Sequence, residues 1–158
     1  MPIIDKTFWL IAIAVTCMNA YFLRSRAAME IARDPELKKG YDQLLKGYLV
    51  CLNLPWLMMG IGILGGGVHS VFDYFYPRSG NPYVLAFHVT VFVLWALMIY
   101  WIYFGGGAEF LVRHPGGMKA DITSPLIMKF LFALMLLGGI AGEIAMWTQA
   151  LPVLKSLQ

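Results

Sequence analysis

Hydrophobic and polar positions alternate along the chain in long blocks. Four apolar runs are separated by polar segments, and they cover residues 8–23, 54–75, 83–104 and 126–151. A helix needs roughly 17–25 apolar residues to cross the hydrocarbon core of a bilayer, which is about 30 Å thick. The pattern therefore predicts an all-α, polytopic integral membrane protein with four transmembrane helices in one membrane domain over residues 1–158.

Helix starts are marked by a polar capping residue close to a proline. The pattern occurs at Asp34-Pro35, Asn81-Pro82 and Ser124-Pro125, and with one intervening residue at Asn53 and Pro55. A capping side chain accepts a hydrogen bond from an unpaired N–H of the first turn, and proline in that turn gives up a donor that has no partner. We therefore expect helices to begin near residues 35, 54, 82 and 125.

The segment over residues 35–52 has a different pattern from the four spans. Its apolar positions recur at helical spacing, at Leu37, Tyr41, Leu44, Tyr48 and Cys51. Its charged side chains fall on other faces. This arrangement predicts an amphipathic helix that lies in the membrane interface.

The composition agrees with a membrane protein. The chain is 59% hydrophobic and 13% charged, with a mean hydropathy of +0.68, well outside the range of soluble domains. Its two cysteines fall within or beside predicted helices, so they do not indicate a disulfide framework.

The distribution of basic residues predicts the orientation. Nine lie on one side of the membrane: Arg24, Arg26, Arg33, Lys38, Lys39, Lys46, Arg113, Lys119 and Lys129. The other three are Lys6, Arg78 and Lys155. Because cytoplasmic loops carry an excess of Lys and Arg, we expect loops 24–53 and 105–125 in the cytoplasm and both termini outside, in an inner or plasma-type membrane. Basic loops of this origin do not imply a nucleic-acid partner.

Three ionisable side chains are predicted at similar depth in the outer leaflet. His69 and Glu143 lie six and eight residues before the ends of their runs, and His88 lies five residues after the start of its run. A carboxylate at this depth is costly unless it is paired, so it marks a functional site by default. We expect Glu143 to pair with His69, with His88 reaching in from the third span and Asp73 orienting the His69 imidazole.

Two glycine pairs predict close helix packing. Gly62 and Gly66 form a GxxxG motif in the second span, and Gly138 and Gly142 form another in the fourth. Small residues at this spacing let helices approach closely in lipid. We expect these two faces to meet, so that His69 and Glu143 are brought together.

Three chemistries compete for this cluster besides a plain ligand or partner site. His69 and His88 could be the axial ligands of a b-type haem, or they could hold a transition metal together with Glu143. Glu143 and the imidazoles could also form a proton relay or transport component. The chain has no Cys-x-x-Cys, His-Glu-x-x-His or Gly-x-Ser-x-Gly motif, which favours a non-enzymatic role.

These patterns together predict a protein that functions by assembling with other proteins in the lipid bilayer. We expect a non-enzymatic membrane subunit or binding protein that associates with itself, or with a larger membrane complex, through its glycine faces. The polar cluster His69, His88, Glu143 and Asp73 is then its ligand or partner site.

Overall fold

The computed structural model describes residues 3–115 and 122–148. Four long helices occur in this part of the chain: α1 (Ile3–Arg33), α2 (Lys38–Leu64), α3 (Pro82–Tyr103) and α5 (Pro125–Thr148). Each is long and apolar enough to cross a membrane. The prediction of an all-α protein with four candidate spans is therefore confirmed.

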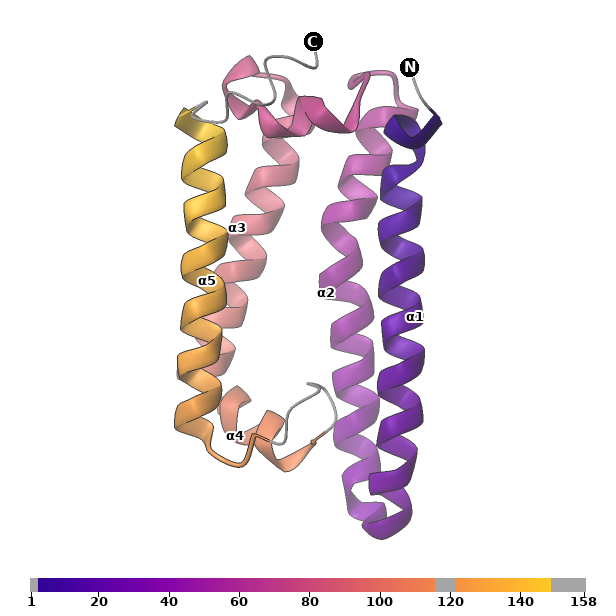
Figure 1. The fold of residues 1–158 in the computed structure, drawn as a ribbon, viewed down its shortest axis with the longest axis vertical. Coiled ribbons are helices and arrows are strands. Elements are labelled where there is room, and N and C mark those ends of the chain that lie inside the picture. The colour runs from indigo at the N-terminus through magenta and orange to yellow at the C-terminus, as the bar shows by residue number, and fades with distance from the viewer. Residues whose placement is uncertain (1–2, 116–121, 149–158) are drawn as a thin grey trace.

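The four long helices run side by side (Figure 1). α1 and α2 form a hairpin, α3 packs against α2, and α5 contacts α3. The 3-10 helices η2 (Val71–Phe75) and η3 (Pro77–Ser79) cross one end, where α1 begins and α5 ends; we call it the η2 end. The short helix α4 (Gly107–Arg113) lies at the opposite α4 end, where it packs against α3 and α5.

The contact between α1 and α2 is the most extensive between any two described elements. On α1 the buried residues recur every three or four positions, at Thr16, Ala20, Leu23 and Ala27. Near the η2 end, a Cβ atom on Gly60 of α2 would lie 2.7 Å from the Trp9 ring of α1. Close approach of this kind provides the packing energy that associates helices in lipid.

The helix over residues 35–52 and the second span are one continuous helix. Pro35–Leu37 form a 3-10 turn, and α2 then runs unbroken from Lys38 to Leu64 with Pro55 in its interior. The expected start near residue 54 is wrong because Asn53 does not act as a cap. Its side-chain nitrogen donates to the Leu49 carbonyl, 2.8 Å away, one turn back in the same helix. Prolines are tolerated inside membrane helices, where neighbouring groups compensate for the missing N–H.

The apolar stripe of this segment faces protein instead of headgroups. Tyr41 is 1% exposed and, with Leu37, packs against Ala27 of α1. The Tyr41 hydroxyl donates to the Pro115 carbonyl at 2.6 Å, which ties α2 to the segment after α4. The prediction that this apolar face lies in the membrane interface is wrong. The face packs against α1, and the segment is part of α2 instead of a separate interfacial helix.

The second span ends at Leu64, eleven residues earlier than expected. Gly66 adopts a left-handed conformation with φ of +72°. The N–H groups of Gly66 and Gly67 then donate to the carbonyls of Ile63 and Gly62. This is the hydrogen-bond pattern of a Schellman motif, which terminates helices and favours glycine at the left-handed position. Residues 65–75 are therefore a turn followed by η2.

The other predicted helix starts agree with the structure. Asp34 accepts a hydrogen bond from the Glu36 N–H at 3.0 Å, and Asn81 accepts one from the Tyr83 N–H at 2.9 Å. The last helix begins at Pro125. The first helix continues ten residues beyond its expected end at Leu23. The predicted end of the fourth span at Leu151, and the basic residues Lys119 and Lys155, lie outside the described residues.

Candidate functional site

A buried histidine–glutamate pair joins α3 to α5 near the η2 end. His88 is 1% exposed and Glu143 is 5% exposed. The His88 Nδ1 atom lies 2.8 Å from Oε2 and 3.1 Å from Oε1 of Glu143. The structure thus pairs Glu143 with His88 of the third span, and not with His69 as expected.

The other nitrogen of the His88 ring is also engaged. Nε2 lies 2.9 Å from the backbone carbonyl oxygen of Tyr74. A carbonyl can only accept, so Nε2 must carry a proton and donate it. One further proton is then shared between Nδ1 and the Glu143 carboxyl group. The pair is either an imidazolium–carboxylate ion pair or a neutral imidazole that accepts from a carboxylic acid.

Helical spacing directs both side chains into the bundle. On α3, Val84 precedes His88 by one turn, and both are buried. On α5, inward-facing positions recur at Met128, Phe132, Gly139 and Glu143. A Cβ atom on Gly139 would lie 2.7 Å from the Trp95 ring of α3. The absence of a side chain at Gly139 therefore lets α3 and α5 approach one turn before the pair.

Tyr74 links this pair to α2. Its hydroxyl donates to the Met59 carbonyl at 3.0 Å while its own carbonyl accepts from His88. Burial, with a smaller contribution from the neighbouring Asp73 carboxylate, raises the pKa of Tyr74 to about 12. The Tyr74 hydroxyl therefore stays protonated and acts as a donor. Through Met59, His88 and Glu143, the residue connects α2, α3 and α5.

Asp73 caps η2 and does not orient an imidazole. Its Oδ2 atom accepts from the backbone N–H groups of His69 and Ser70, each at 3.0 Å. The Ser70 hydroxyl accepts in turn from the Phe72 N–H at 3.2 Å. This reciprocal capping box fixes the start of η2, and with it the position of the Tyr74 carbonyl.

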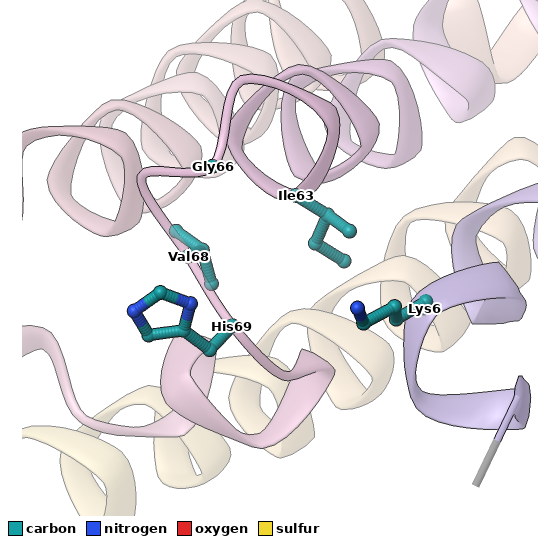
Figure 2. A pocket seen from close by; sticks show the side chains of 5 residues that line it. All are labelled: Lys6, Ile63, Gly66, Val68 and His69. Carbon is teal, nitrogen blue, oxygen red and sulfur yellow. The ribbon is translucent and has the colours of Figure 1, made fainter. Parts of the chain in front are cut away.

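His69 lies in the loop before η2, where its side chain is exposed. It borders a small cavity of about 240 Å³ together with Lys6, Ile63, Gly66 and Val68. Figure 2 shows the Lys6 side chain extending from α1 toward the loop that carries Val68 and His69. The predicted alignment of Gly62, Gly66, His69 and Asp73 along one helix is wrong because α2 ends before Gly66.

The two glycine pairs do not meet. Gly62 faces inward, where a Cβ atom would collide with the Tyr74 hydroxyl. Gly66 lies in the turn, and a Cβ atom there would meet nothing within 4 Å. The same is true of Gly138 and Gly142 on α5. The predicted contact between Gly66 and Gly142 is therefore wrong, and the second GxxxG motif faces outward.

The arrangement of the candidate ligands does not favour a bound haem or metal. Both nitrogens of His88 are occupied by Glu143 and Tyr74, so the ring would have to leave both partners to ligate iron. Over residues 3–115 and 122–148, no three His, Cys, Asp or Glu side chains are grouped as a metal site would require. Ligand binding by His69, His88, Glu143 and Asp73 stays a prediction.

Two residues of this region were not found from the sequence. Tyr74 contributes through its backbone carbonyl, which no side-chain pattern reveals. The second is Trp147, whose ring lies 5.9 Å from the His88 ring. Its indole nitrogen is buried without a hydrogen-bond partner among the described residues. The only available signal was its position one turn after Glu143, on the same face of α5.

Comparisons of the chain with models of protein families, with curated proteins and with solved structures found no match.

Proposed function

We propose that the protein is a non-enzymatic membrane subunit that assembles with a second copy of itself, or within a larger membrane complex, through one face of α5. This α5 glycine face consists of Leu131, Met135, Gly138 and Gly142, which are spaced i, i+4, i+7 and i+11. Residues at this spacing lie along one side of a helix.

The open space over Gly138 and Gly142 is the observation that carries the proposal. A Cβ atom at either glycine would meet nothing within 4 Å, and the adjoining Met135 is 62% exposed. A backbone bared in this way is the surface on which a second helix packs in lipid, because close van der Waals contact drives association there.

The His88–Glu143 pair supports this role by fixing the rotation of α5. Successive helical residues are about 100° apart around the axis. With Glu143 bound to His88 in the interior, its neighbour Gly142 is turned outward. A ligand site is not needed to explain a buried carboxylate that already has a partner. The pair instead determines which face of α5 is presented.

The charge distribution supports the predicted orientation. Among the described residues, eight Lys and Arg lie toward the α4 end, and Lys6 and Arg78 lie at the η2 end. Because cytoplasmic surfaces carry an excess of basic residues, this distribution supports an orientation with the α4 end in the cytoplasm and the η2 end outside, in an inner or plasma-type membrane.

The test is the oligomeric state of labelled protein in lipid vesicles, measured by resonance energy transfer between donor- and acceptor-labelled copies. Gly138→Leu and Gly142→Leu should each lower the energy transfer. The apparent association affinity derived from it should fall at least about tenfold, which corresponds to roughly 1.4 kcal/mol. Ala14→Leu is the control, because it also adds a leucine side chain at an exposed small residue, but on α1 and away from the α5 glycine face. Monomeric wild-type protein that copurifies with no other membrane protein would overturn the proposal.

A further inference from the structure

An elongated apolar cleft lies between α2 and α3 toward the α4 end. Its volume is about 610 Å³, within the range of sites that bind small molecules. Leu52 and Leu97 line it deep between the helices, whereas Gln43 and His114 line it near the α4 end. We refer to it as the α4-end cleft.

The cleft runs along the helix axes for about one membrane leaflet. Its α2 lining extends from Gln43 to Leu52, which corresponds to about 14 Å at 1.5 Å per residue. Its α3 lining, from Leu94 to Trp101, corresponds to about 10 Å. Half of the hydrocarbon core is about 15 Å, so the cleft has the length and orientation of one acyl chain.

Three basic residues are sequence neighbours of residues that line this cleft. Arg24, Lys46 and Arg113 each directly adjoin a lining residue in the sequence, and all three are exposed. The ion pairs found at this end among the described residues join Arg33 to Glu30, Lys38 to Asp42 and Lys129 to Glu109. Arg24, Lys46 and Arg113 take part in none of these pairs, although Arg24 and Lys46 interact electrostatically with the Asp42 carboxylate.

We propose that the α4-end cleft binds an anionic glycerophospholipid, with one acyl chain between α2 and α3 and its phosphate beside Arg24, Lys46 and Arg113. Basic pockets between membrane helices on the cytoplasmic side select anionic headgroups in this manner. The apolar lining alone accommodates any acyl chain. The charge at its mouth is what selects the lipid class.

Polar groups in the cleft lie where the glycerol esters of this lipid would lie. Gln43 and Tyr48 both line the cleft, and their side chains can donate to ester carbonyls. His114 Nδ1 donates to the Phe110 carbonyl at 2.7 Å, and the ring packs so closely on α2 that a Cβ on Gly40 would overlap it. The headgroup end of the cleft is thus built from fixed side chains. This inference does not depend on the α5 glycine face.

The experiment is native mass spectrometry of the full chain, released from nanodiscs of equimolar dioleoylphosphatidylglycerol and dioleoylphosphatidylcholine. Wild-type protein should retain phosphatidylglycerol preferentially. Gly47→Leu fills the cleft from a position with open space and should remove at least about nine-tenths of the retained lipid. Ala14→Leu is the control, because Ala14 is an exposed small residue of α1 that lies neither in the cleft lining nor on the α5 glycine face, and it should retain lipid as the wild type does.

Charge variants keep the test decisive if Gly47→Leu does not fold. Lys46→Gln and Arg113→Gln should each reduce the preference for phosphatidylglycerol by about fivefold, the effect of one cation near a membrane surface. Equal retention of both lipids by wild-type protein would overturn the proposal. Undiminished phosphatidylglycerol in a folded Gly47→Leu variant, or an unchanged preference in both charge variants, would also overturn it.

Discussion

Removing the Glu143 carboxyl group should destabilise the bundle more than removing any lipid-facing side chain of α5. In Glu143→Ala, the Nδ1 atom of His88 loses its hydrogen-bond partner. Because the His88 side chain is only 1% exposed, no water molecule can take the place of the carboxyl group. In Glu143→Gln, the amide can donate to Nδ1 while Nε2–H remains on the Tyr74 carbonyl.

The magnitude can be bounded from two directions. Leaving a buried polar group unsatisfied costs about 1–3 kcal/mol. Hydrogen bonds between membrane helices average about 0.6 kcal/mol, with a maximum near 1.7 kcal/mol. We expect Glu143→Ala to lower the free energy of unfolding by about 1–2 kcal/mol, a factor of roughly 5–30 in the folded-to-unfolded ratio. The loss in Glu143→Gln should be less than half of that.

The assay is equilibrium unfolding in mixed micelles as the fraction of dodecyl sulfate is raised, followed by helical circular dichroism. Ile144→Ala is the control, because Ile144 is the next residue along α5 and is 57% exposed. The double variant His88→Ala/Glu143→Ala separates the coupling between the two side chains from the loss of each alone. The reasoning fails if the glutamine variant is as unstable as the alanine variant, or if Glu143→Ala is no worse than Ile144→Ala.

Three further predictions follow from the same structure. Wild-type protein should lose stability as the pH rises from about 10 to about 12, because the folded state keeps the Tyr74 proton above the pKa of about 10 that the phenol has when unfolded; Tyr74→Phe should flatten this dependence in a pH series of melts, and an equal slope would contradict it. Gly62→Ala should lower the melting temperature because its Cβ displaces the Tyr74 hydroxyl, whereas Gly47→Ala, in open space, should leave it unchanged or raise it; equal melting temperatures would argue against the close contact. In whole cells of a background without native cysteines, Ser79→Cys should react with a membrane-impermeant maleimide and Lys39→Cys should not, and the reverse labelling would invert the assigned orientation.

The sequence predicted the number of candidate membrane spans correctly because apolar length is a local property. It also located the helix starts at Pro35, Pro82 and Pro125, where the proline or its cap sits at a real helix boundary. It failed at Pro55 because the same residue pair is compatible with a helix interior when the Asn53 side chain bonds one turn back. It failed at Gly66 because the apolar run continues through a left-handed residue that hydropathy does not detect.

The site was only partly predictable for a related reason. Glu143 could be singled out because a carboxyl group deep in an apolar run requires a partner. His69 was the wrong choice of partner, because the choice between His69 and His88 depends on where α2 ends. The Tyr74 carbonyl could not be found at all, since every residue has one and only the fold decides which carbonyl faces the His88 ring.

The length of the α1–α2 hairpin has a consequence for anything that binds beyond the membrane. From Arg24, α1 continues nine residues to Arg33, about 14 Å at 1.5 Å per residue, and the hairpin extends farther than α4 (Figure 1). Because the two helices pack against each other and both continue into their membrane-spanning parts, the hairpin forms a rigid projection. A soluble protein docked on its tip would be held at a constant height above the lipid, and that height would be set by the number of helical turns.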